Sequence, residues 1–263
     1  MGDTGLRTER NGPVLTLVLD RPDRLNAQTP HLWEALREAG RSLPGDVRVV
    51  VVRGEGRAFS AGLDRAAFTP GGIPGAPGLA DLAAMPESVA DTHIAGYQEA
   101  FSWLRRPEVV SVAAVQGHAI GAGFQLALAC DLRVLADDAR LAMAETSLGL
   151  VPDLGGTAPL VASVGYSRAL EICVTGRQVG AEEAQRIGLA TLVVPAADLA
   201  SATGDLVGAL LAAPAGAVTE TKALLLRAAG VADADGQRAA ERTAQIRRLH
   251  ALAAAMTPAE RPS

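Results

Sequence analysis

The nearly continuous apolar run at positions 47–52 constrains the fold of this chain more than any other feature of the sequence. Five of its six residues are valine, and such a run is typical of a strand that is covered on both faces. Further strands are predicted at 14–19, 109–115, 132–135 and 141–144. Because doubly covered strands belong to sheets flanked by helices, we expect an α/β fold with parallel strands.

Segments with helical spacing alternate with these strands. The segment 29–41 carries Pro30 in its first turn, where a missing N–H costs nothing, and another helix is expected at 94–105. After about Gly156 the pattern becomes mostly helical. Helical spacing occurs at 158–164, 167–174, 181–187, 199–211, 218–228 and 237–254. The tail is rich in alanine and leucine and needs a packing partner. It either folds back on the core or forms a subunit interface, and periodicity alone leaves both possibilities open.

The charge and cysteine content exclude several classes of protein. A net charge of −5 and a pI near 5.4 argue against a nucleic-acid binder, which needs a basic face. Two cysteines cannot build a disulfide framework or a zinc cage, and the four histidines follow no metal-binding pattern. No apolar segment follows the charges at the start, so no secretory signal is expected. The most apolar stretch, 109–130, is interrupted by polar residues and is not expected to span a membrane. These features favour a soluble protein of the reducing cytoplasm.

A glycine-rich segment, 117–123, follows the predicted strand at 109–115 and precedes an apolar helix predicted at 124–130. Free backbone N–H groups at a helix N-terminus, together with the helix dipole, stabilise negative charge on an oxygen. A dinucleotide motif fits poorly, because Leu126 stands where its third glycine would be. The alternative is a tight turn in which small residues allow close packing.

A second segment of small residues, 59–64, lies just beyond the strand at 47–52. Small residues are found where a backbone must approach another group closely. Two strand ends that each present an N–H could bind one carbonyl oxygen, which is the arrangement of an oxyanion hole. Taken by itself, the segment could equally be an ordinary turn.

Glu145 and Asp153 lie eight residues apart in a stretch that otherwise lacks charge. Apolar surroundings raise the pKa of a carboxyl group, which suits it to proton transfer near neutral pH. In the alternative interpretation both side chains are solvated loop acids, or Asp153 caps the helix that follows Gly156.

Taken together, these segments resemble the crotonase, or enoyl-CoA hydratase/isomerase, family over roughly residues 10–200. The matching segments, in order, are 21–27, 58–64, 116–123, 130–133, 145–157, 175–177 and 181–184. The resemblance implies a crotonase-like spiral core of repeated ββα units over 1–200, which carries an acyl-CoA site. It also implies a helical C-terminal region over 201–263 that serves oligomerisation, and a homotrimer or dimer of trimers.

The resemblance also implies roles for individual residues. The backbone N–H groups of Leu63 and Ala122 would form the oxyanion hole; the family usually has glycine at position 122, but a backbone contact survives the change to alanine. The remaining residues assigned to the binding of the acyl-CoA are Arg24, Leu25, Ala61, Asp64, Gly121 and Gln125. The loop at 69–78 and the helix near Ile94 are expected to shape the acyl pocket.

Gln125 is the main departure from the family pattern. Family hydratases carry one catalytic glutamate at that position and a second at the position of Glu145, and an amide cannot take or release a proton at neutral pH. Asp153 stands where some isomerases of the family carry a catalytic aspartate. We therefore expect isomerisation of a double bond, with Glu145 shuttling the proton and no metal or redox cofactor. The alternatives are a hydratase that uses Glu145 alone and an acyl-CoA-binding module without catalysis.

Overall fold

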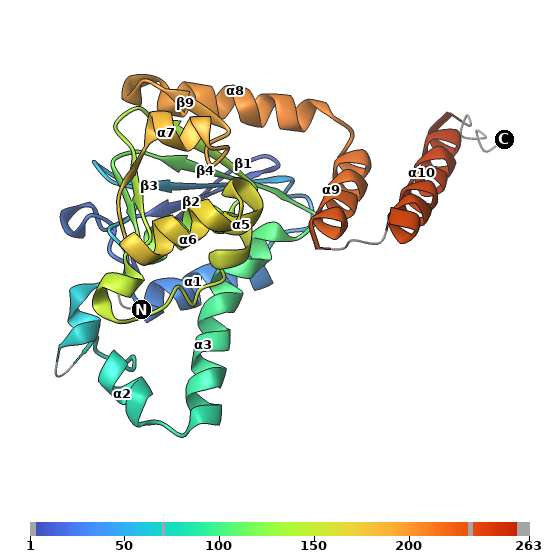
Figure 1. Cartoon of the computed structure of the whole chain (residues 1–263). Helices are drawn as coiled ribbons and strands as arrows, with labels where there is room; N and C mark the ends of the chain where they lie inside the picture. Colours follow the sequence, from blue (N-terminus) through green and yellow to red (C-terminus); the bar gives the residue numbers. More distant parts are fainter. Residues whose placement is uncertain (1–3, 70–71, 231–233, 257–263) are drawn as a thin grey trace. The chain divides into compact units, whose positions relative to one another are not determined.

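The computed structural model describes residues 4–69, 72–230 and 234–256. The chain divides into two compact units, residues 1–210 and residues 211–263, which can be followed by colour in Figure 1. The first unit contains both sheets, and the second contains only helices among its described residues.

The larger sheet of the first unit has six strands among the described residues. In spatial order they are β1 (Leu6–Asn11), β2 (Val14–Leu19), β3 (Val49–Gly54), β4 (Val110–Val115), β6 (Leu132–Ala136) and β9 (Leu192–Val194). Only the β1–β2 pair is antiparallel; the pairs from β2 to β9 are parallel. Five of the six residues of β3 are buried, as expected for a strand that is covered on both faces.

A smaller three-stranded sheet receives the second strands of two ββα repeats and one further strand. It contains β5 (His118–Ile120), β7 (Arg140–Ala142) and β8 (Val179–Gly180). The chain passes from β4 to β5 and then into helix α4, and from β6 to β7 and then into helix α5. The strands of each pair thus enter different sheets, which confirms the expected ββα repeats.

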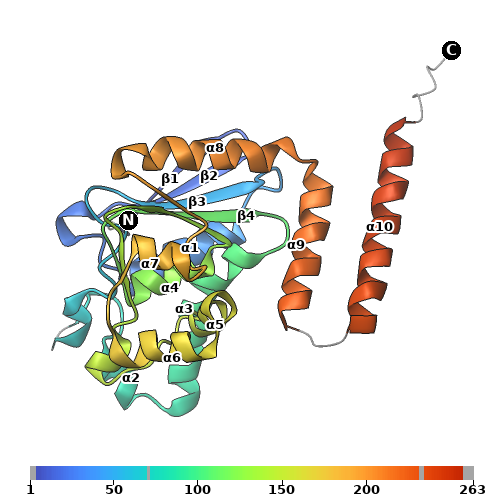
Figure 2. The same cartoon turned by 45° about the horizontal axis from the view of Figure 1, so that its top comes forward.

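Helices cover both faces of the larger sheet. In Figure 2, α8 lies along one face, and α1 and α4 lie beyond the opposite face. The α-helices of the first unit are α1 (Pro30–Arg41), α2 (Leu79–Ala84), α3 (Glu87–Ser102), α4 (Ala122–Ala129), α5 (Thr157–Val164), α6 (Tyr166–Thr175), α7 (Ala181–Arg186) and α8 (Leu199–Ala212), which runs into the second unit. Short 3-10 turns lie at Pro22–Arg24, Arg65–Phe68, Trp103–Arg105, Glu145–Leu148 and Ala196–Asp198.

Helix α4 is held at both ends by features of the sequence. Gly121, with a φ of 51°, precedes its first residue. At the other end Arg133 is buried and donates hydrogen bonds to the carbonyl oxygens of Ala127 (3.4 Å), Cys130 (2.8 Å) and Leu189 (2.6 Å). A cation is favourable at a helix C-terminus, and the three carbonyls offset the desolvation that lowers the pKa of Arg133. These contacts fix the position of α4, and with it the position of its N-terminus.

The second unit contains α9 (Ala215–Gly230) and α10 (Ala234–Met256). An ion pair joins them, in which Arg247 contacts both carboxylate oxygens of Glu220 at 2.8 and 2.5 Å. The Nε2 of Gln237 also donates to the carbonyl oxygen of Leu224 at 3.2 Å. The two helices therefore pack on one another through side chains of both.

Most elements predicted from the sequence are confirmed, and the exceptions are short. Thr29 accepts a hydrogen bond from the backbone N–H of Leu32 and caps α1. The interpretation of 117–123 as a turn was wrong, because β5 occupies its centre. No sequence prediction covered β1, α2, β8 or β9, and α3 begins seven residues before its predicted start. Strands of two or three residues depend on partners that are distant in sequence, so they leave little local signal.

Candidate active site

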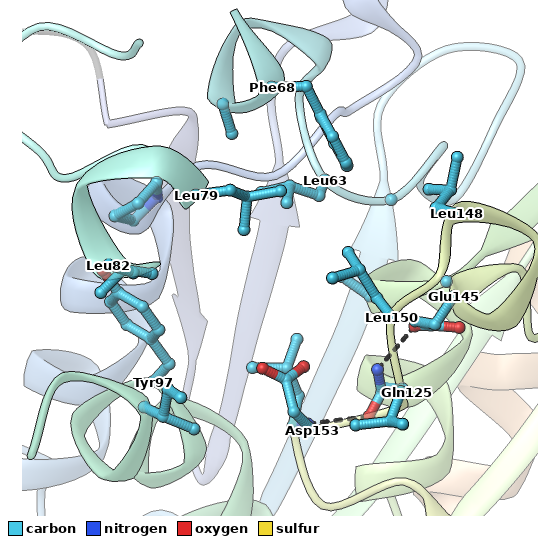
Figure 3. A pocket seen from close by; sticks show the side chains of 18 of the residues that line it. Leu63, Phe68, Leu79, Leu82, Tyr97, Gln125, Glu145, Leu148, Leu150 and Asp153 are labelled. Atoms are coloured by element: carbon cyan, nitrogen blue, oxygen red, sulfur yellow. Dashed lines mark hydrogen bonds between the residues drawn. The ribbon is translucent and has the colours of Figure 1, made fainter. Parts of the chain in front are cut away.

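A cavity of about 850 Å³ lies within the first unit. Its walls are formed by the loop 61–63, the N-terminal end of α4, the segment 144–154, and helices α1, α2 and α3. Most of the lining side chains are apolar. The lining residues with a hydroxyl, a carboxamide or an ionisable group are Arg65, Tyr97, Gln125, Glu145 and Asp153. Figure 3 shows the last three on one side of the cavity.

The loop at 60–63 lies directly against the segment that leads into α4. The N–H of Ser60 donates to the carbonyl oxygen of His118 at 2.8 Å, and the N–H of Ile120 donates to the carbonyl oxygen of Ser60 at 3.0 Å. Gly62 has a φ of 89°, and a Cβ there would lie 2.5 Å from the carbonyl oxygen of Ile120 and 3.6 Å from the nitrogen of Ala122. Only glycine fits this approach, so both interpretations of these segments, close packing and a binding site, remain compatible with the structure.

Among the residues that line the cavity at this junction, Leu63 and Ala122 have backbone N–H groups without an acceptor among the described residues. The two neighbours of Leu63 in the chain both bond to Gln28. The N–H of Gln28 donates to the carbonyl oxygen of Gly62 at 2.7 Å, and the N–H of Asp64 donates to the carbonyl oxygen of Gln28 at 2.8 Å. The N–H of Leu63 therefore points away from Gln28. Ala122 is the first residue of α4, where an N–H has no partner within the helix. Both residues line the cavity.

A buried network of side chains holds the loop in this conformation. The Oγ of Ser60 donates to the carbonyl oxygen of Asn26 at 2.8 Å, and accepts from the N–H of Gly62 and the Nε2 of Gln28, both at 3.2 Å. The indole Nε1 of Trp33 donates to the Oε1 of Gln28 at 2.8 Å. Since these groups are already paired, the Leu63 N–H is in place before a ligand arrives, as an oxyanion hole requires.

Glu145 is held by Gln125, whose orientation is fixed by the backbone. The Oε1 of Gln125 accepts from the N–H groups of Leu154 (2.9 Å) and Gly156 (3.3 Å), so its Nε2 must point the other way, and it donates to Glu145 Oε1 at 2.7 Å (Figure 3). The second oxygen of Glu145, Oε2, is buried and has no hydrogen-bond partner among the described residues. One carboxylate oxygen is thus fixed and the other is unpaired.

The pKa values of both carboxyl groups are raised. Burial raises the pKa of Glu145 most, and the negative charge of Asp153 raises it further, while hydrogen bonds from its own backbone and from Gln125 lower it. Burial also raises the pKa of Asp153, although part of this side chain is exposed. Asp153 does not cap α5, because the N-cap residue is Gly156 and no side chain caps this helix. A raised pKa makes a carboxyl group a better proton acceptor, which suits both groups to proton transfer.

The structure brings together seven of the ten residues assigned from the sequence. Glu145, Asp153, Leu63, Ala122, Ala61, Gly121 and Gln125 line the cavity. Arg24 is exposed in the 3-10 turn at Pro22–Arg24, and Leu25 accepts a hydrogen bond from the N–H of Ala61 at 2.8 Å. Asp64 pairs with Arg21 at 2.9 Å and accepts from the N–H of Ala66. These last three residues do not line the cavity, and their binding of a ligand stays a prediction.

Several residues of the site were not found from the sequence. Gln28, Trp33 and Ser60 act through contacts with residues that are distant in the chain, which no local pattern reveals. The apolar wall from α2 and α3 was expected only in outline, from the loop at 69–78 and the helix near Ile94. Pro77 and Ile94 do line the cavity. The spacing of Ala90, Ile94 and Tyr97 on one helical face was the available signal.

Neither a group of potential metal ligands nor a single membrane-spanning helix occurs in the described part of the chain. No group of three or more His, Cys, Asp or Glu side chains could hold a metal ion there. No single helix among these residues is long and apolar enough to cross a membrane, whereas the bent helix pair Ala196–Ala212 and Ala215–Ala229 has sufficient length and apolar composition, and nothing beyond these two properties.

The sequence is similar to a family of enzymes and to several known proteins. The sequence profile of the family described as enoyl-CoA hydratase/isomerase matches residues 9–254. A probable enoyl-CoA hydratase of Mycobacterium tuberculosis is 33% identical over 193 residues, 73% of this chain and 69% of that protein. A carnitinyl-CoA dehydratase of Salmonella arizonae is 37% identical over 204 residues, 76% of this chain and 72% of that protein.

Solved structures match over nearly the whole chain. A putative enoyl-CoA hydratase from Thermobifida fusca is 50% identical, and its complex with CoA covers 95% of both chains with a TM-score of 0.89. Its complex with acetoacetyl-CoA covers 94% of this chain and 95% of that chain, with a TM-score of 0.90. An enoyl-CoA hydratase from Mycobacterium smegmatis is 30% identical, covering 93% and 91% of the chains, with a TM-score of 0.81.

Proposed function

Because this chain belongs to the enoyl-CoA hydratase/isomerase family of enzymes, we propose that it isomerises the double bond of an enoyl-CoA thioester. In this proposal the N–H groups of Leu63 and Ala122 bind the thioester oxygen, and Glu145 moves the proton. The observation that carries it is the unpaired, buried Oε2 of Glu145, in the same cavity as two N–H groups that lack acceptors.

The proposed reaction converts a 3-enoyl thioester into the conjugated 2-enoyl thioester. Glu145 removes a proton from C2, the electrons move onto the thioester oxygen to give a dienolate, and the two N–H groups stabilise its negative charge. The proton is then delivered to C4, by Glu145 itself or by way of Asp153. Each oxyanion-hole donor contributes about 2.7–4 kcal/mol to such a step, because it is oriented before the charge develops.

The hydrogen bonds of Gln125 favour isomerisation over hydration. Its carbonyl oxygen accepts from two backbone N–H groups, and its amide nitrogen donates to Glu145. Position 125 can therefore neither take a proton nor accept a hydrogen bond from an attacking water. Hydration by two acidic groups, one at each of these positions, is not possible in this arrangement.

The second candidate is a hydratase that uses Glu145 as its only acid and base. The names of the relatives, enoyl-CoA hydratase and carnitinyl-CoA dehydratase, favour it. Two substrates separate the candidates: trans-3-hexenoyl-CoA, followed by the absorbance of the conjugated product, and crotonyl-CoA, followed by mass spectrometry. We expect fast conjugation of the first and no gain of water by the second. Rapid hydration of crotonyl-CoA without isomerisation would contradict the proposal, and binding without any turnover would support a non-catalytic module.

The raised pKa of Glu145 predicts a characteristic pH dependence. A base must be ionised, so kcat/KM for isomerisation is expected to fall as the pH drops through a pKa above the ordinary glutamate value of 4.5. In Gln125→Glu a carboxylate replaces the amide donor, which raises the pKa of Glu145 further and moves the acid limb to higher pH. Gln185→Glu, which adds the same charge at an exposed position, is the control. An unchanged acid limb in Gln125→Glu would show that Glu145 is not the titrating group.

The cofactor requirement, the oligomeric state and the cellular location can also be stated as proposals. The reaction as written needs no metal or redox cofactor, because the proton and the electron pair stay within the substrate and the carboxylates. We also propose a homotrimer or dimer of trimers that forms through the region 201–263, in a cytoplasmic protein. Light scattering of the full chain measures the mass of the particle and tests the oligomeric state.

A further inference from the structure

We propose that the acyl group taken by this site is apolar, carries no carboxylate and is longer than four carbons, and that it lies between Glu145 and helices α2 and α3. The inference rests on the proposed function only in so far as the ligand is a CoA thioester. It does not depend on which reaction follows.

The wall of the cavity that faces Glu145 consists of side chains from two helices. Leu79 and Leu82 come from α2, and Ala90, Ile94 and Tyr97 come from α3. Figure 3 shows Leu79, Leu82 and Tyr97 across the cavity from Glu145 and Gln125. An acyl chain whose thioester oxygen is held at Leu63 and Ala122 would extend past Glu145 toward this wall.

The space is larger than a four-carbon acyl group requires. A volume of about 850 Å³ lies in the upper part of the range, roughly 300–1,000 Å³, of pockets that hold drug-sized ligands. The heavy atoms of a butenoyl group number only six, counting the carbonyl oxygen and the thioester sulfur. Ala90, one helical turn before Ile94, contributes only a methyl group to this wall. The size of the cavity therefore favours a longer chain.

The electrostatics of the cavity disfavour an acyl group that ends in a carboxylate. Glu145 and Asp153 are both in this cavity, and Arg65 is the one cationic side chain among its lining residues. The far wall offers little polar contact, because the Tyr97 hydroxyl is buried without a hydrogen-bond partner among the described residues, and the ring packs on Trp33 with centroids 4.8 Å apart. The terminal carboxylate of such an acyl group would lose its hydration at this wall. It would also lie near Glu145 and Asp153, which carry the same charge when ionised.

The first experiment measures binding without turnover. Dissociation constants of the full chain for butyryl-, hexanoyl-, octanoyl- and adipoyl-CoA are determined by calorimetry. Complete burial strengthens binding about fourfold for each methylene, so we expect at least a tenfold gain from butyryl- to octanoyl-CoA. Adipoyl-CoA has six carbons, like hexanoyl-CoA, but ends in a carboxylate, and it should bind at least tenfold more weakly. Equal affinity across the chain lengths, or tighter binding of adipoyl-CoA, would overturn the proposal.

The second experiment places the chain within the cavity. Ala90→Phe fills the space beside Ile94 and should abolish the preference for octanoyl-CoA while leaving the affinity for butyryl-CoA within threefold. Ala95→Phe is the matched control on the same helix, at an exposed position that does not line the cavity. Similar binding profiles for both variants would place the acyl group elsewhere. If octanoyl-CoA binds tightly but no enoyl-CoA is converted, the proposed function fails while this inference stands.

Discussion

Glu145→Gln is expected to lower kcat for isomerisation of trans-3-hexenoyl-CoA by about 10²–10⁴-fold, the usual contribution of a general base. The variant keeps the volume of the side chain and an oxygen that can accept the hydrogen bond from Gln125 Nε2. Binding should therefore survive, with dissociation constants for saturated acyl-CoA thioesters within about threefold of the wild-type values. Stopped-flow absorbance for turnover and calorimetry for binding separate the two effects. Unchanged turnover would remove Glu145 from the mechanism.

The same variant has a consequence for stability that depends on pH. The pKa of Glu145 is raised in the folded state, so the folded protein binds more protons than the unfolded chain, and its stability falls as the pH rises through this raised pKa. Glu145→Gln removes that cost. We expect its Tm to exceed the wild-type Tm at pH 8 and the difference to disappear near pH 4. Glu182→Gln, at a side chain that is 97% exposed, should change Tm at neither pH.

Ala122→Pro removes one hydrogen-bond donor of the proposed oxyanion hole, the backbone N–H of Ala122. Proline lacks the N–H and is well tolerated at the first position of a helix, which Ala122 occupies. Loss of one oxyanion donor is expected to lower kcat by about 10²–10³-fold, or about 2.7–4 kcal/mol. The helix should remain intact, which circular dichroism and Tm measurements check.

Ala122→Gly is the matched control, because it shortens the side chain and retains the N–H. We expect its kcat to stay within a few-fold of the wild-type value. If Ala122→Gly and Ala122→Pro lost activity equally, the methyl group rather than the N–H of Ala122 would matter. If neither lost activity, the thioester oxygen would not bind at this helix terminus.

The sequence predicted those elements whose structure depends mainly on their own residues. Valine-rich runs predicted β3 and β4, and Thr29 with Pro30 marked the start of α1. It was insufficient for β5, a strand of three residues, whose segment contains glycines typical of a turn and whose pairing with β7 joins residues about twenty positions apart. Short strands are stabilised by their partners more than by their own propensities.

In the candidate site, too, some residues could be found from the sequence and others depend on contacts between distant segments. The small residues near Leu63 and Ala122 and the two carboxylates could be found from their spacing and from the family resemblance. The part played by Gln125 could not be found, because it depends on where the backbone N–H groups of Leu154 and Gly156 lie in space. The family resemblance identified Gln125 only as a missing acid. The structure shows that the amide also orients Glu145.

A crystal structure with a bound, unreactive acyl-CoA such as octanoyl-CoA would test the central claim most directly. The thioester oxygen should lie about 2.7–3.1 Å from the nitrogens of both Leu63 and Ala122, with Glu145 Oε2 about 3–3.5 Å from C2. A thioester oxygen bound elsewhere, or a Glu145 carboxylate turned away from C2, would contradict the proposed mechanism.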